Sequence, residues 1–168
     1  MTSSPPRATR DYDRVASSLR AGTTRDATMA AAVDALWDAL ASTGVSWLGF
    51  YTKAPGQDEM ILGARRDKPA CSPISLEGMC GRSWRARQPI VLKDAKTLTS
   101  GYIACDPNDR GEVVIPLLER DGSCWGVLDL DSHDADVFDD HDVAELTRLM
   151  EQIGLSSPPA KRPSTIHL

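Results

Sequence analysis

Apolar residues recur every three or four positions in three stretches of the chain, and this spacing predicts amphipathic helices. The predicted helices run from about Asp11 to Arg20, from Thr23 to about residue 41, and from about Asp139 to residue 153. The spacing of Thr23 to Asp26 fits a capping box at the start of the second helix. Each helix is followed by a glycine, the residue that commonly ends a helix: Gly22, Gly44 and Gly154.

Elsewhere the pattern alternates with a period of two, which predicts strands. The predicted strands cover residues 45–52, 60–63, 90–92, 112–118 and 124–131, and a short helix is predicted over residues 78–87. Leu48 and Phe50 share one face of the first strand, which we expect to line the core. Trp47 and Tyr51 share the opposite face. This mixture predicts an α+β domain in which helices pack on an antiparallel sheet.

The composition is that of an average globular protein, with 168 residues, 41% of them hydrophobic and 26% charged. A chain of this length can bury a core without the help of disulfides. We expect one domain over residues 10–155. Both ends are rich in proline and polar residues, so we expect disordered tails at residues 1–9 and 156–168.

Charge and hydropathy exclude several classes of function. The net charge of −5 argues against general nucleic-acid binding, which needs a basic surface. The chain has no apolar run near the roughly 18 residues of a membrane span. Its polar, proline-rich start also lacks the apolar stretch of a secretory signal. We therefore expect a cytoplasmic protein that binds neither membranes nor nucleic acids.

The cysteines are the first candidates for chemistry. Cys71, Cys80, Cys105 and Cys124 form no C-x-x-C pair, so a structural zinc site is not expected. Two alternatives are left for a reducing compartment, inert thiols and redox chemistry, and composition alone favours inert thiols.

Position separates the four cysteines. Cys71 and Cys105 lie in predicted loops, where chemistry concentrates. Cys80 lies in the first turn of the predicted short helix, where free backbone N–H groups would favour a thiolate. Cys124 lies in a predicted strand, which favours a structural role.

Three carboxylates are expected close together on the predicted sheet. Asp129 and Asp131 are two residues apart in one strand, so they share a face, and Glu112 opens the neighbouring strand. Such a cluster suits a cationic group, such as a substrate ammonium, or a proton donor with a raised pKa. The alternative is an ordinary solvated sheet face. The spacing does not fit an EF-hand calcium loop, and we predict no metal site.

Six segments together carry a resemblance to a known family. In chain order they are WLGFY at 47–51, KPAC at 68–71, GMCG at 78–81, IACD at 103–106, RGEVVIP at 110–116 and GVLDLDS at 126–132. From about Tyr12 to Leu155 the chain resembles the free methionine-(R)-sulfoxide reductases, a stand-alone branch of the GAF-domain family. The resemblance implies a GAF fold, with a six-stranded antiparallel sheet and helices packed on its faces.

The resemblance also implies roles for the cysteines. Cys105 resembles the nucleophile that becomes a sulfenic acid, and Cys71 resembles the resolving cysteine that then forms a disulfide with it. Cys80 resembles the third cysteine, an alternate resolver or relay. The implied enzyme needs no cofactor, is recycled by thioredoxin or a similar dithiol, and is a homodimer.

Five further residues resemble the family's substrate site. Trp47 and Tyr51 resemble the aromatic pair around the methylthio end of the substrate. Glu112, Asp129 and Asp131 resemble the residues that hold its amino group and sulfoxide oxygen. Asp131 is the expected partner of the ammonium, and Glu112 or Asp129 is the expected proton donor. The alternative function is a non-catalytic GAF domain that senses a small ligand.

Overall fold

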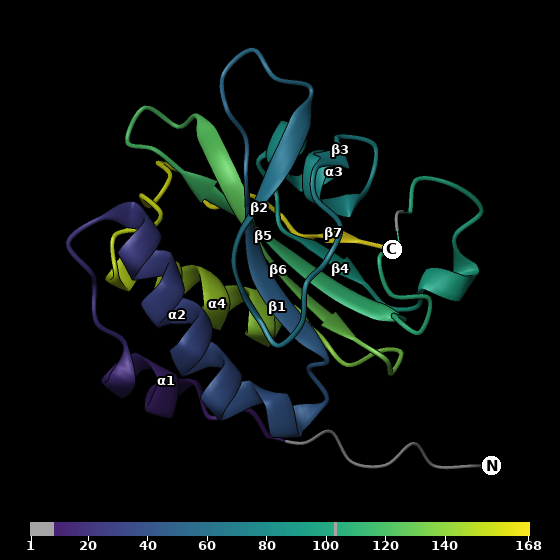
Figure 1. Cartoon of the computed structure of the whole chain (residues 1–168), viewed down its shortest axis with the longest axis horizontal. Helices are drawn as coiled ribbons and strands as arrows, with labels where there is room; N and C mark the ends of the chain where they lie inside the picture. Colours follow the sequence, from purple (N-terminus) through teal and green to yellow (C-terminus); the bar gives the residue numbers. More distant parts are fainter. Residues whose placement is uncertain (1–8, 103) are drawn as a thin grey trace.

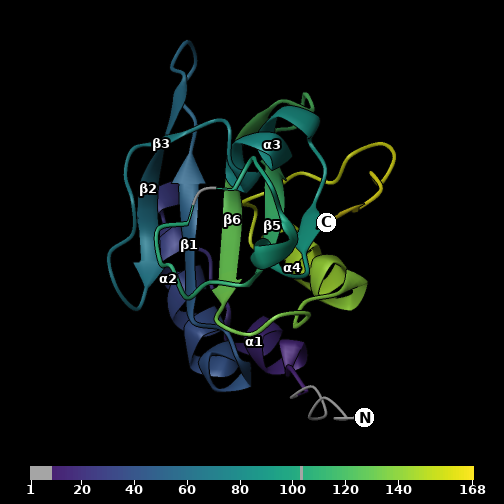
Figure 2. The same cartoon turned by 90° about the vertical axis from the view of Figure 1, so that its right-hand side faces the viewer.

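The computed structural model describes residues 9–102 and 104–168, in which one twisted sheet lies between helices (Figures 1 and 2). The sheet has seven strands in the order β3-β2-β1-β6-β5-β4-β7. Their bounds are β1 Trp47–Thr52, β2 Glu59–Arg66, β3 Ile74–Ser75, β4 Ile90–Leu92, β5 Gly111–Leu118, β6 Cys124–Ser132 and β7 Ile166–His167. The central strands are fully or mostly buried because both faces of the sheet are covered.

The expectation of six antiparallel strands is only partly correct. The α+β class is confirmed, but β7 adds a seventh strand and pairs parallel to β4. The other strand pairs of the described residues are antiparallel.

Helices cover the two faces of the sheet unequally. One face carries α1 (Tyr12–Ser18), α2 (Arg25–Leu40) and α4 (Asp140–Gln152). The opposite face carries α3 (Met79–Ala86), as Figure 2 shows. Two short 3₁₀ turns, η1 (Ala41–Thr43) and η2 (Ala95–Thr97), complete the helical elements. None of the helices in the described ranges is both long enough and apolar enough to cross a membrane.

The residue predicted to cap the N-terminus is correct for α4 and wrong for α2. Asp139 caps α4 by accepting hydrogen bonds from the backbone N–H groups of His141 and Asp142, as predicted. Thr23 does not cap α2. Its neighbour Thr24 does so, because its hydroxyl oxygen accepts the N–H of Ala27 and α2 begins one residue later.

The faces of β1 are as predicted and separate two cores. Leu48 and Phe50 are fully buried beneath α1, α2 and α4. Trp47 and Tyr51 lie in the smaller core on the other face, together with Met79 and Cys80 of α3. The face that carries α3 therefore holds the predicted site residues Trp47, Tyr51 and Cys80.

The expectation of a disordered tail at residues 156–168 is wrong. The segment crosses the end of the sheet and forms β7, where the N–H of Ile166 donates to Pro89 and that of Leu168 to Val91. These bonds satisfy the outer edge of β4, and Ile166 and Leu168 add apolar contacts to the smaller core. Of the tail predicted at residues 1–9, residues 1–8 lie outside the described part of the chain.

Candidate active site

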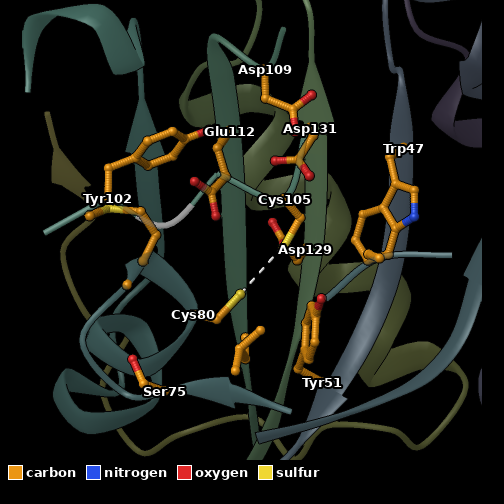
Figure 3. Close-up of a pocket in the computed structure, with 14 residues that line it drawn as sticks. Trp47, Tyr51, Ser75, Cys80, Tyr102, Cys105, Asp109, Glu112, Asp129 and Asp131 are labelled. Atoms are coloured by element: carbon orange, nitrogen blue, oxygen red, sulfur yellow. Dashed lines mark hydrogen bonds between the residues drawn. The ribbon is translucent and has the colours of Figure 1, made fainter. Parts of the chain in front are cut away.

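A small cavity lies between the sheet and α3, where the predicted site residues converge (Figure 3). Its volume is about 40 Å³. The strands supply Trp47 and Tyr51 from β1, Glu112 from β5, and Asp129 and Asp131 from β6. Cys80 of α3 and Cys105 of the loop before β5 complete the set of predicted residues that line it. Cys71 lies outside the cavity lining.

The three predicted carboxylates come together because of strand register. Glu112 of β5 pairs directly with Asp131 of β6, and Asp129 is on the same face two residues along β6. Glu112 is 5% exposed and Asp129 6% exposed, so the alternative of a solvated sheet face is wrong. One side-chain oxygen of Asp129, Oδ1, has no hydrogen-bond partner among the described residues.

Burial makes these groups unusual acids. It raises the pKa of Asp129 to about 7. Burial and the neighbouring charge of Asp129 raise the pKa of Glu112 well above its ordinary value, and the same causes raise that of Asp131. At neutral pH the cluster therefore keeps protons that exposed carboxylates would have lost, and it can supply one to a bound molecule.

This proton uptake predicts a pH-dependent effect of Asp129→Asn on stability. The folded-state pKa of Asp129 exceeds the ordinary 3.8, so its neutral form favours the fold. That contribution is complete below pH 4 and is lost as the pH rises through about 7. We expect Asp129→Asn to raise the free energy of unfolding at pH 8, by on the order of a few kcal/mol, and by much less at pH 5.

Urea unfolding of the oxidised protein at both pH values measures this difference. Asp58→Asn, at an exposed position before β2, is the matched control and should leave the difference between pH 5 and pH 8 unchanged. An equal effect of Asp129→Asn at both pH values would contradict the assignment.

The aromatic side chains of Trp47 and Tyr51 on β1 line the cavity and also bind the loop after β2. The rings of Trp47 and Tyr51 lie side by side with centroids 6.2 Å apart, and both face the cavity. Gly49 lies between them along the strand, and a Cβ there would stand 2.6 Å from the Trp47 ring. Their polar ends anchor the loop after β2, because the Trp47 indole N–H donates to the carbonyl of Lys68 (2.9 Å) and the Tyr51 hydroxyl to that of Cys71 (2.8 Å).

A disulfide joins the two loops that border the cavity. It links Cys71 to Cys105, whose Cα atoms are 5.6 Å apart, within the range that disulfide geometry requires. This is the pairing that the family resemblance implies. Both residues are exposed, so a reductant in solution can reach the bond.

Cys80 differs from its expectation as a thiolate-favouring residue. It is 5% exposed and its Sγ donates to Oδ2 of Asp129 at 3.3 Å, drawn as a dashed line in Figure 3. Burial and the charges of Asp129 and Glu112 raise the pKa of this thiol well above its usual range. The short helix cannot offset them, so Cys80 is a protonated thiol.

Cys124 is remote from the cavity lining. Its half-buried thiol donates to the carbonyl of Gly126 (3.2 Å), and burial raises its pKa to about 11. These contacts agree with a structural role.

Two groups of described residues bring possible metal ligands together, and each has another explanation. In the first, Cys80, Glu112 and Asp129, a proton is shared between the thiol and a carboxylate. In the second, Asp106, Asp109 and His133, the Asp106 carboxylate is bound by the ammonium of Lys68. Neither group gives positive support for a metal.

Sequence reasoning missed two titratable residues that line the cavity, Tyr102 and Asp109. Burial and the charge of Glu112 raise the pKa of the Tyr102 hydroxyl. Asp109 is 8% exposed, and burial together with the charge of Asp106 raises its pKa. Both lie in the irregular stretch before β5, where no periodic pattern shows which side chains turn inward.

Comparison with known proteins places this geometry in a family. A GAF domain model matches residues 22–156. The free methionine-R-sulfoxide reductase of Escherichia coli (strain K12) is 34% identical over 145 residues, which is 85% of this chain and 84% of that protein. The enzyme of the same name from Saccharomyces cerevisiae is 34% identical over 125 residues, covering 72% and 69%.

A solved structure agrees with these sequence relatives. The free methionine-R-sulfoxide reductase of Neisseria meningitidis, in complex with its substrate, superimposes with a TM-score of 0.75 at 31% identity. The match covers 84% of this chain and 83% of that one. The chain therefore belongs to the GAF-domain family and, within it, to the free methionine-R-sulfoxide reductases.

Proposed function

We propose that this protein reduces free methionine-(R)-sulfoxide to methionine, with Cys105 as nucleophile and Cys71 as resolving cysteine. The observation that carries the proposal is the Cys71–Cys105 disulfide at the border of a cavity lined by buried, proton-holding carboxylates. The relatives named free methionine-R-sulfoxide reductase support the same reaction class.

The side chains of the cavity suit the parts of this substrate. The substrate's ammonium pairs with Asp131, whose carboxylate is half-buried beside Glu112 on the sheet. Its methylthio end lies against the rings of Trp47 and Tyr51. Its sulfoxide oxygen faces Glu112 or Asp129, the two groups that hold a proton in a buried setting.

The chemistry is a two-electron exchange between two sulfur atoms. The Cys105 thiolate attacks the sulfoxide sulfur, and the carboxylic acid gives its proton to the sulfoxide oxygen as the sulfur–oxygen bond breaks. The released oxygen then bonds to the Cys105 sulfur as hydroxide, and the bond between the two sulfurs breaks with its electron pair going to the methionine sulfur, so methionine leaves reduced and Cys105 is oxidised to a sulfenic acid. The carboxyl group then recovers a proton from solvent.

Resolution returns the enzyme to a form that a dithiol can reduce. The Cys71 thiol attacks the sulfenic sulfur of Cys105, a disulfide forms, and the oxygen leaves as water. An external dithiol of the thioredoxin type then reduces the bond by thiol–disulfide exchange and is itself oxidised to a disulfide. The identity of this reductant and the homodimeric state stay predictions.

Thioredoxin-coupled NADPH consumption tests the proposal. We expect turnover with free methionine-(R)-sulfoxide and a loss of at least about 10²-fold in kcat/KM with the (S) form or the N-acetylated amino acid. The (S) form points its oxygen away from the proton donors, and acetylation removes the charge that faces Asp131. Comparable rates with the two stereoisomers would contradict the proposed pocket. The alternative of a sensing GAF domain predicts binding without turnover.

A further inference from the structure

The carboxylate of Asp106, outside the cavity lining, contacts residues of three segments near the disulfide. Oδ2 of Asp106 lies 2.5 Å from the ammonium of Lys68 and 3.1 Å from Nε2 of His133. Its other oxygen accepts the backbone N–H and the side-chain amide of Asn108. Lys68 is on the loop after β2, Asp106 precedes β5, and His133 follows β6.

The Lys68–Asp106 ion pair spans the same two loops as the disulfide. Lys68 shares the loop of Cys71, and Asp106 is the neighbour of Cys105 along the chain. Asp106 is held in place on its own loop by Asn108, so it offers Lys68 a fixed partner. The hydrogen bond to Lys68 lowers the pKa of Asp106, so the pair is charged across the neutral range.

Within residues 9–102 and 104–168, the other hydrogen bonds between side chains and the Cys71 loop run to the sheet and not to the Cys105 loop. The indole of Trp47 and the hydroxyl of Tyr51 bind the backbone carbonyls of Lys68 and Cys71, and both come from β1. They hold the loop to the sheet. The ion pair to Asp106 acts between the two cysteine-bearing loops themselves.

We propose that the Lys68–Asp106 ion pair is a latch that holds the two cysteine loops together before the disulfide forms, so that both are positioning residues for the resolving step. The catalytic part of this inference rests on the proposed function. An intramolecular reaction accelerates as its partners are held closer. The latch raises the effective concentration of the Cys71 thiol at the Cys105 sulfenic acid, and it also stabilises the disulfide relative to the dithiol.

The equilibrium of the disulfide with a dithiothreitol redox buffer tests the latch without any turnover. We expect Lys68→Met and Asp106→Asn each to lower the equilibrium constant for disulfide formation about threefold to fivefold, the range of a partly exposed ion pair. A mere effect of charge on the thiols would move the two variants in opposite directions, because one removes a cation and the other an anion. Loss of the latch lowers the equilibrium constant for disulfide formation in both variants.

Two further measurements test the latch, one on a double variant and one at high salt concentration. The double variant Lys68→Met/Asp106→Asn should lose no more than either single variant, because both remove the same interaction. Lys68→Arg should retain the wild-type constant. In 1 M NaCl the wild type should approach Lys68→Met, since the screening length falls to about 3 Å.

The matched control is Arg66→Met. Arg66 forms an exposed ion pair with Asp34 of α2, just before the same loop, but this pair does not reach the Cys105 loop. We expect its redox equilibrium to match that of the wild type. An equal drop in Arg66→Met would show that any loss of charge near the loop has the effect, and would overturn the latch.

Rapid mixing of reduced protein with one equivalent of methionine-(R)-sulfoxide tests the catalytic part. In Lys68→Met the first methionine should form at the wild-type rate, while disulfide formation slows threefold to fivefold and the sulfenic acid is trapped in higher yield by dimedone. A raised KM with unchanged disulfide formation would overturn the latch and place Lys68 at the substrate carboxylate. If no methionine forms in wild-type protein, the proposed function fails, while the redox equilibrium still decides on the latch.

Discussion

Cys105→Ser is expected to reduce the turnover of free methionine-(R)-sulfoxide at least about 10³-fold and to leave the fold unchanged. A serine hydroxyl is not ionised at neutral pH and cannot form a sulfenic acid, so both the attack and the storage of the oxidising equivalent are lost. Cys105 is exposed, and its substitution removes no core packing. Coupled NADPH consumption gives the rate, and the unfolding midpoint of reduced protein checks the fold.

Cys124→Ser is the matched control for this variant. Its half-buried thiol donates to a backbone carbonyl, and a hydroxyl can do the same, so activity should persist at a stability cost of about 1 kcal/mol. Wild-type turnover in Cys105→Ser would move the nucleophile to Cys80, despite the raised pKa of that thiol.

Removing the proton donor should give the second large effect. Among Glu112→Gln and Asp129→Asn, the variant that lacks the donor should lose about 10²- to 10⁴-fold in kcat. Both substitutions keep the size of the side chain and remove the carboxylic acid. The other variant should change mainly KM, because that side chain lines the substrate's binding cavity without supplying the proton.

The pH dependence identifies the donor. A donor works only while protonated, and the pKa of Asp129 is raised to about 7, so with Asp129 as donor kcat falls as the pH rises above about 7. This alkaline limb should disappear in Asp129→Asn and persist in Glu112→Gln. If Glu112 is the donor, the two results exchange. A large kcat and an unchanged profile from pH 6 to 9 in both variants would rule out both carboxylates.

Much of the site could be predicted because the strand period decides which side chains share a face. Trp47 and Tyr51 on one side of β1, and Asp129 with Asp131 on β6, follow from alternation alone. The meeting of Glu112 with Asp131 needs the register of β5 and β6, which the short turn between them restricts.

Features that depend on contacts distant in sequence could not be predicted in this way. The segment at 156–168 has the composition of a disordered tail, yet the open edge of β4 gives its backbone hydrogen-bond partners. Burial, and after it the charge of Asp129, 49 residues away, raise the pKa of Cys80 and outweigh the local effect of a helix start. Lys68 and Asp106 are 38 residues apart and carry no shared pattern.

The size of the cavity has a consequence for the search for inhibitors. Its volume is about 40 Å³ in the disulfide form, and a neighbouring pocket of about 370 Å³ shares Trp47, Ala70, Cys105, Asp109 and Asp131 with its lining. Compounds screened against air-oxidised protein will therefore meet a site whose border is fixed by the disulfide, where the larger outer pocket competes with the small cavity for hits. A useful screen keeps the protein reduced throughout, and a compound that binds only the disulfide form would act by blocking the reductant.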